Sequence, residues 1–121
     1  MGAGAIGGLA GAYMSRAGHD VLLVDRWVEH VDALNASGLY IDGVRGAMTI
    51  PVRATTPDRL SGPLDAVLVA TKSQHTQDAV RQILPLLNRD SVVVSYQNGF
   101  NEPDIQTLLE HNGLDPGQVV G

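Results

Sequence analysis

The sequence predicts an α/β domain with a doubly wound, mostly parallel sheet, and three observations support this. Short apolar runs alternate with amphipathic segments, a pattern typical of parallel strands joined by crossover helices. A glycine-rich loop opens the first helical segment, and polar residues follow the ends of later strands. The 121 residues are 44% hydrophobic and carry a net charge of −5, so residues 1–121 are assigned to one soluble domain.

The expected helices and strands follow from the spacing of apolar residues. Spacings of three and four predict helices, and short uninterrupted apolar runs predict strands buried on both faces. The expected helices cover residues 6–17, 27–37, 74–87 and 101–110. The expected strands cover residues 21–24, 39–41, 44–52, 66–70, 91–95 and 119–121. The Asp42–Gly43 pair favours a tight turn, so the second and third strands are expected to form a hairpin.

The opening segment contains glycines with the spacing GxGxxG at the start of the first expected helix. Gly2 permits a tight turn, Gly4 lets the backbone approach a pyrophosphate, and Gly7 lets the helix pack closely on a strand. The helix N-terminus offers free N–H groups and a partial positive charge to phosphates. A dinucleotide site in a Rossmann-like fold is therefore predicted, and a plain packing loop is the alternative. The expected cofactor contacts are Gly2, Ala3, Gly4, Ala5, Ile6 and Gly7.

Asp25 ends the next expected strand, close to the separation of about 20 residues that the dinucleotide motif requires. Its carboxylate could accept hydrogen bonds from the adenosine ribose, or it could simply cap the following helix. A carboxylate here favours the free 2′-hydroxyl of NAD(H), whereas Arg26 beside it could pair with the 2′-phosphate of NADP(H). The residues alone leave both cofactors open.

The ends of the sequence depart from a complete domain of this kind. The glycine motif should follow a strand, and only Met1 precedes Gly2. That strand is central in a doubly wound sheet, so we expect the sequence to be truncated at its start. Residues 119–121 read as a strand that has barely begun, so we expect truncation at the other end too.

Composition and motifs exclude several classes of function. Eight basic residues against thirteen acidic ones form no cluster that would bind nucleic acid, and no apolar run approaches the roughly 20 residues that span a membrane. The four histidines lack metal-ligand spacing, so no metal is expected. No nucleophile elbow supports hydrolysis. The absence of cysteine suits a reducing cytoplasm.

Several segments together resemble one enzyme family. The GAGAIGG opening, the hairpin after the second helix, VATK at 69–72 and YQNG at 96–99 resemble the N-terminal domain of ketopantoate reductase, also called 2-dehydropantoate 2-reductase. That family reduces 2-dehydropantoate to (R)-pantoate with NADPH, in pantothenate and coenzyme A synthesis. The resemblance implies that Lys72 lies beside the cofactor and that Asn98 lies near the nicotinamide and substrate. Both residues follow strand ends, where open α/β sheets place ligands.

The resemblance also implies what lies outside this chain. The family's proton-donating lysine and substrate-binding carboxylate lie in a helical C-terminal domain, so no catalytic residue is expected here. The resemblance implies a small 2-keto acid as substrate and NADP(H) as cofactor, with NAD(H) as the alternative because of Asp25. The full-length protein could form a homodimer. A related NAD(P)-dependent 2-keto acid dehydrogenase and a non-catalytic NAD(P)-sensing module stay open. Lys72 could also be a solvated lysine, and Asn98 only part of a turn.

Overall fold

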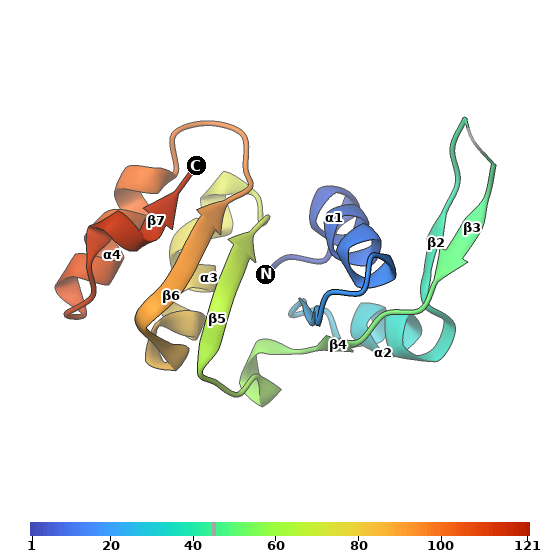
Figure 1. Ribbon diagram of the computed structural model, residues 1–121, viewed down its shortest axis with the longest axis horizontal. Helices are drawn as coiled ribbons and strands as arrows, with labels where there is room; N and C mark the ends of the chain where they lie inside the picture. Colours follow the sequence, from blue (N-terminus) through green and yellow to red (C-terminus); the bar gives the residue numbers. More distant parts are fainter. Residues whose placement is uncertain (45) are drawn as a thin grey trace. The chain divides into compact units, whose positions relative to one another are not determined.

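The computed structural model describes residues 1–44 and 46–121, and these form two compact units. The glycine-loop unit comprises Gly2–Leu60, and the lysine-loop unit comprises Ser61–Gly121 together with Met1. Helices and parallel strands occur in both (Figure 1), as the α/β prediction requires. Within the described ranges, none of the helices has the length and apolar character needed to cross a bilayer.

The glycine-loop unit has a small core between two helices and short strands. Its helices are α1 (Ala5–Arg16) and α2 (Val28–Ser37), followed later by a 3-10 turn at Pro57–Arg59. Its strands are β1 (Leu23–Val24), β2 (Leu39–Ile41), β3 (Met48–Ile50) and β4 (Ala54–Thr55). The parallel pair β1–β4 and the antiparallel pair β2–β3 form separate sheets. Ala3, Leu23 and Leu34 form one buried apolar cluster of this unit.

The hairpin and the strand after it differ in part from the sequence prediction. The β2–β3 hairpin is confirmed, but the strand predicted over 44–52 has the bounds Met48–Ile50. The predicted Asp42–Gly43 turn is wrong, because the turn hydrogen bond lies further along the chain, from the Gly46 N–H to the Gly43 carbonyl at 2.9 Å. Arg45 lies outside the described residues. Strand β4 was not predicted, since Ala54–Thr55 is too short to give a pattern. The side-chain amide of Asn35 on α2 bonds both the N–H and the C=O of Ala54, as a neighbouring strand would.

Helix α1 buries its small residues rather than its large apolar ones. The buried positions are Gly8, Gly11 and Ala12. A Cβ placed on Gly11 would overlap a methyl carbon of Leu23, so this glycine permits the close approach of the helix to β1. The apolar positions expected to share a helix face include Ile6, Leu9 and Tyr13, and these side chains are exposed.

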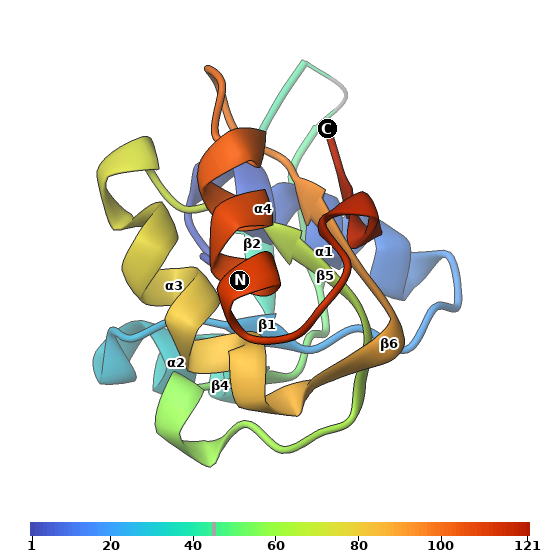
Figure 2. The ribbon, with the colours of Figure 1, turned by 90° about the vertical axis from the view of Figure 1, so that its left-hand side faces the viewer.

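The lysine-loop unit is a three-stranded parallel sheet packed against two helices. Its strands are β5 (Leu64–Val69), β6 (Leu87–Ser95) and β7 (Val119–Val120), in that spatial order. Its helices are α3 (Thr76–Ile83) and α4 (Glu102–His111), which lie side by side (Figure 2). Short 3-10 turns occupy Ser73–His75, Leu84–Leu86 and Pro116–Gln118. The fully buried apolar side chains are Val69, Val80, Ile83, Val93, Ile105 and Leu109.

The boundary between α3 and β6 lies earlier than the sequence predicted. The helix expected over 74–87 ends at Ile83, because Pro85 has no N–H to continue the α-helical hydrogen bonds. Strand β6 begins at Leu87, paired with Leu64, and the register then shifts before Ala66 pairs with Val92. The polar residues of this shift bond locally: the Asp90 N–H donates to the Asn88 side chain at 2.9 Å. Turn-forming residues thus lie inside the strand.

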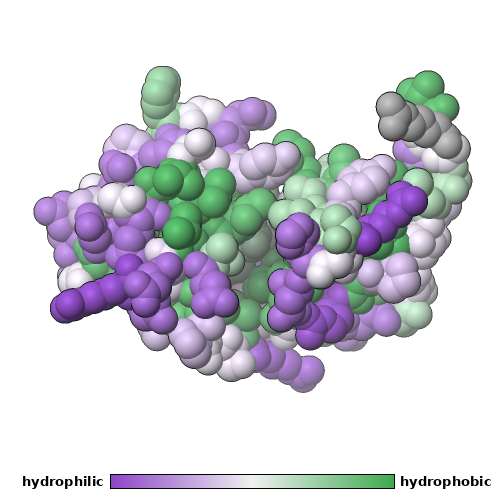
Figure 3. Space-filling model, viewed as in Figure 1, coloured by the Kyte–Doolittle hydropathy of each residue, from purple (hydrophilic) through white to green (hydrophobic). Residues whose placement is uncertain are grey.

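The two faces of the β5–β6–β7 sheet are covered unequally. Hydrophobic side chains gather over these strands on the face visible in Figure 3. Val92 and Val120 remain 39% and 46% exposed, so the expected burial on both faces is only partly met. The backbone of Met1 lies beside β5, since its nitrogen donates to the Leu68 carbonyl at 2.7 Å and its carbonyl accepts from Ala70 at 2.8 Å.

Candidate functional site

The glycine loop has the backbone geometry that an anion-binding turn needs. Gly2 has φ +92°, a conformation that side-chain-bearing residues rarely adopt, and its N–H donates to the Val24 carbonyl at 2.8 Å. Gly4 is the N-cap of α1, and a Cβ built there would meet no atom within 4 Å. The first turn of α1 has neither a side-chain cap nor an acidic residue. The positive end of this helix is therefore open to an anion beside Gly4.

Two side chains hold Ala3, the residue between the first two glycines of the motif. The Ala3 N–H donates to one carboxylate oxygen of Asp25 at 3.0 Å, and the other oxygen accepts from the Trp27 N–H at 2.9 Å. The Ala3 carbonyl lies 2.7 Å from the imidazole Nε2 of His30. Ala3 itself is buried, so these contacts fix the loop from inside the protein. Asp25 thus supports the glycine loop and Trp27, the residue before α2, whereas the N-cap of α2 has no side-chain cap bond.

A cleft of about 470 Å³ opens beside this loop, wholly within the glycine-loop unit. The indole of Trp27 and the ring of His30 stack in its wall, with centroids 5.7 Å apart. Two carboxylates, Asp25 and Asp42, line the cleft, whereas the exposed Arg26 is not among its lining residues. Other lining residues are Ala3, Gly4, Ala5, Leu9, Leu39, Tyr40 and Ile41. The cleft therefore combines flat aromatic surface with negative charge next to the helix N-terminus.

Lys72 and Asn98 belong to the lysine-loop unit, and their loops follow neighbouring parallel strands. Lys72 lies three residues after the end of β5, and Asn98 lies three residues after the end of β6. Because β5 and β6 are parallel and adjacent, the two loops leave the same edge of the sheet. The Ser73 hydroxyl donates to the Asn98 carbonyl at 3.2 Å, which joins the loops directly. Both the Lys72 and Asn98 side chains are exposed.

The predicted residues thus fall into two groups, one in each unit. The glycine loop and Asp25 are in contact in the first, and the loops of Lys72 and Asn98 are bonded in the second. The position of Trp27, two residues after Asp25, predicts a place near the adenosine pocket, and Trp27 lines the cleft. Sequence reasoning missed His30 and Asp42. His30 and Asp42 have no local pattern that would distinguish them from surface residues.

Comparison with known proteins gives consistent matches to one family. The family model described as ketopantoate reductase PanE/ApbA matches residues 1–119. The 2-dehydropantoate 2-reductase of Pyrococcus abyssi is 40% identical over 120 residues, which cover 99% of this chain and 38% of that protein. The chain therefore spans little more than a third of the length of this relative.

Solved structures agree in fold. The PanE/ApbA family ketopantoate reductase from Ralstonia eutropha JMP134 superposes with a TM-score of 0.83 and 36% identity, over 98% of this chain and 38% of that one. D-mandelate dehydrogenase, in a ternary structure with NADH and anilino(oxo)acetate, gives a TM-score of 0.78 and 27% identity, over 88% of this chain and 35% of that one. These matches identify the Rossmann-like α/β class expected from the glycine loop. With the family model matched from residue 1 to residue 119, the chain belongs to the ketopantoate reductase family.

Proposed function

We propose that the chain is the N-terminal cofactor-binding part of an NADPH-dependent 2-dehydropantoate 2-reductase, which reduces ketopantoate to (R)-pantoate in pantothenate and coenzyme A synthesis. The observation that carries this proposal is the glycine loop at the uncapped N-terminus of α1, in which the buried Ala3 is held by hydrogen bonds to Asp25 and His30. Such a loop binds a pyrophosphate with little reorganisation. Family membership supports the reductase assignment.

Each group of residues has a separate task in this proposal. Gly2–Gly7 would hold the pyrophosphate through backbone N–H groups and the α1 N-terminus, and Asp25 would keep that loop in place. Lys72 would bind phosphate or ribose oxygens, and the Asn98 amide would donate and accept hydrogen bonds at the nicotinamide and the keto acid. The bound cofactor supplies the hydride that reduces the ketone. The proposed setting is the cytoplasm, with a small 2-keto acid as substrate and a homodimer as the assembly.

A second candidate is a related 2-keto acid dehydrogenase that uses NAD(H). The cleft favours it, because Asp25 and Asp42 contribute carboxylates while Arg26 does not line it. Negative charge repels a 2′-phosphate but accepts hydrogen bonds from a free ribose hydroxyl. The match to D-mandelate dehydrogenase bound to NADH is a further observation in its favour.

Titration with NADPH and NADH, followed through the fluorescence of Trp27, tests the cofactor site. Trp27 is the only tryptophan and lines the cleft, so we expect saturable quenching. Gly4→Ala should weaken binding at least about tenfold, because its Cβ would occupy the space left for the pyrophosphate. Gly43→Ala is the matched control, since a Cβ there also meets no atom within 4 Å and φ is not positive. Quenching that is absent in the folded wild-type chain, or equal in both variants, would refute the site.

Asp42→Asn tests the choice between the two cofactors. The substitution removes one negative charge from the cleft and keeps the side-chain size, so the affinity for NADPH should rise roughly threefold relative to NADH, a change expected of a solvent-screened charge. The same fluorescence titration measures both affinities. Asp32→Asn, an exposed carboxylate of α2 that does not line the cleft, is the control and should leave the ratio unchanged. A ratio unaltered by Asp42→Asn would mean that this carboxylate does not face the ribose.

A further inference from the structure

A single side-chain amide connects the two loops that carry Lys72 and Asn98. Gln97 follows β6, and its Nε2 reaches the loop after β5, where it donates to the Thr71 carbonyl at 2.7 Å. The same nitrogen donates to the hydroxyl of Thr76, the first residue of α3, at 2.8 Å. Because Thr71 directly precedes Lys72, this amide fixes the backbone on one side of the lysine.

The backbone of Asn98 is held by a second pair of side chains. Its carbonyl accepts from the Nδ2 of Asn101 at 3.0 Å and from the hydroxyl of Ser73 at 3.2 Å. Asn101 joins the rest of the network through the Thr76 hydroxyl, which donates to its Oδ1 at 3.5 Å. Lys72 therefore lies between two neighbours, Thr71 and Ser73, that are each bonded to the loop after β6.

The network is internal, whereas the groups that it holds face outward. Thr76 and Asn101 are 1% and 6% exposed, yet Lys72 and Asn98 are exposed. In the described residues, every buried side-chain nitrogen and oxygen has a hydrogen-bond partner. A fully satisfied buried polar network has one favoured arrangement, unlike apolar contacts, which tolerate small slips. The network thus holds the backbone from which the two exposed side chains extend.

We propose that Gln97 and Asn101 are positioning residues that hold the backbone at Lys72 and Asn98 in place, so that these two side chains extend from fixed points toward the dinucleotide and the keto acid. The proposal rests on the function proposed above for Lys72 and Asn98. Gln97 acts through the Thr71 and Thr76 bonds, and Asn101 acts through the Asn98 carbonyl. Two loops that are already ordered lose less conformational entropy when a ligand binds, so the network raises affinity without touching the ligand.

Gln97→Met tests this role directly. Methionine keeps the length of the side chain and removes its donor and acceptor, so the loops lose the bonds of this amide to Thr71 and Thr76 and keep the direct bond from the Ser73 hydroxyl to the Asn98 carbonyl. The NADPH or NADH affinity of the chain should fall about tenfold, because the loosened loops must be ordered when the dinucleotide binds. The backbone amide signals of Lys72 and Asn98 in a heteronuclear NMR spectrum should shift and broaden as the loops gain mobility.

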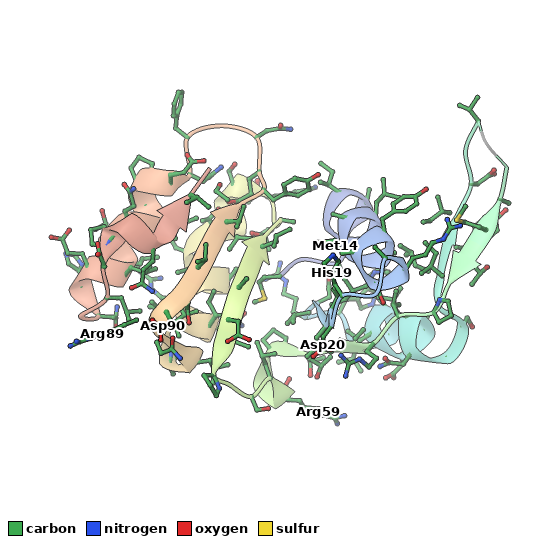
Figure 4. All side chains as sticks on the ribbon, viewed as in Figure 1. Met14, His19, Asp20, Arg59, Arg89 and Asp90 are labelled. Atoms are coloured by element: carbon green, nitrogen blue, oxygen red, sulfur yellow. The ribbon has the colours of Figure 1, made fainter. Side chains whose placement is uncertain are left out.

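Gln118→Met is the matched control in the same unit. The Gln118 Nε2 also donates twice, to the carbonyls of Asn88 at 2.9 Å and Ser91 at 2.7 Å. These lie in the first part of β6, where Arg89 and Asp90 are labelled in Figure 4, away from the loop after Ser95. This variant should lose a similar amount of stability in urea unfolding, yet it should bind dinucleotide like the wild type and leave the Lys72 and Asn98 signals unchanged.

A third variant separates positioning from general damage. Asn101→Asp keeps an acceptor for the Thr76 hydroxyl and removes the donor to the Asn98 carbonyl, so it should weaken binding like Gln97→Met. Equal binding losses in Gln97→Met and Gln118→Met, or none in either Gln97→Met or Asn101→Asp, would overturn the proposal. A wild-type chain that binds neither dinucleotide would instead refute the proposed function. The NMR signals alone would then test the positioning role. Unchanged backbone amide signals of Lys72 and Asn98 in Gln97→Met would overturn it.

Discussion

Gly38→Ala is expected to destabilise the chain by roughly 3 kcal/mol, the upper range for a single backbone substitution. Gly38 follows α2 with φ +76° and ψ −175°, a conformation essentially confined to glycine that costs a side-chain-bearing residue about 1–3 kcal/mol. The new Cβ would also lie 2.6 Å from the backbone carbonyl oxygen of Ile50, closer than atoms in real structures approach. Since Ile50 pairs with Leu39 in the hairpin, relieving the contact would disturb the β2–β3 register.

Gly18→Ala is the control for this substitution. Gly18 also follows a helix of the same unit and has φ +99°, but a Cβ there meets no atom within 4 Å. It should therefore lose only the backbone term of about 1–2 kcal/mol. Urea unfolding of both variants measures the difference, with the slope of the transition unchanged. Equal losses would show that the Ile50 carbonyl moves aside freely.

The parts of the fold that the sequence predicted depend on local pattern. The glycine spacing, the helix ends at Gly18 and Gly38, and the apolar run of β5 are read from neighbouring residues, and the structure contains each of them. The support of Asp25 for the glycine loop was foreseen only as helix capping or ribose binding. Its bond to the Ala3 N–H spans 22 positions of sequence, so no local signal could indicate it.

What was missed depends on tertiary contact. The close approach of α1 to β1 occurs at Gly11, which lies beyond the glycine motif and has no special local sequence. Strand β4 exists because β1 and the amide of Asn35 satisfy its backbone, not because its own residues favour a strand. Gln97 was interpreted only as part of a YQNG segment, although its hydrogen bonds to Thr71 and Thr76 make it one of the links between two loops.

Asp25→Ala should remove both the order of the glycine loop and most of the dinucleotide affinity. Ala3 is 2% exposed, so without the carboxylate its N–H would be buried with no partner, at a cost of about 1–3 kcal/mol. The Trp27 N–H at the start of α2 would lose its acceptor as well. Urea unfolding should show a loss of about 2–3 kcal/mol, and the Trp27 titration should show binding weakened more than about tenfold.

Two comparisons separate this support role from a simple loss of charge. Asp25→Asn should still be destabilised, because the amide oxygen can accept from only one of the two backbone N–H groups. The amide NH2, itself a donor, would then face the other N–H. Asp20→Ala removes an equally charged side chain of the same unit (Figure 4) that is 90% exposed and ion-paired with the exposed Arg53. It should cost less than about 1 kcal/mol and leave binding unchanged. If Asp25→Asn behaved like the wild type, neither the charge nor the second acceptor oxygen would be needed, and the support of both N–H groups by the carboxylate would be refuted. If it fell with Asp25→Ala, the carboxylate would act through the two backbone N–H groups that it holds.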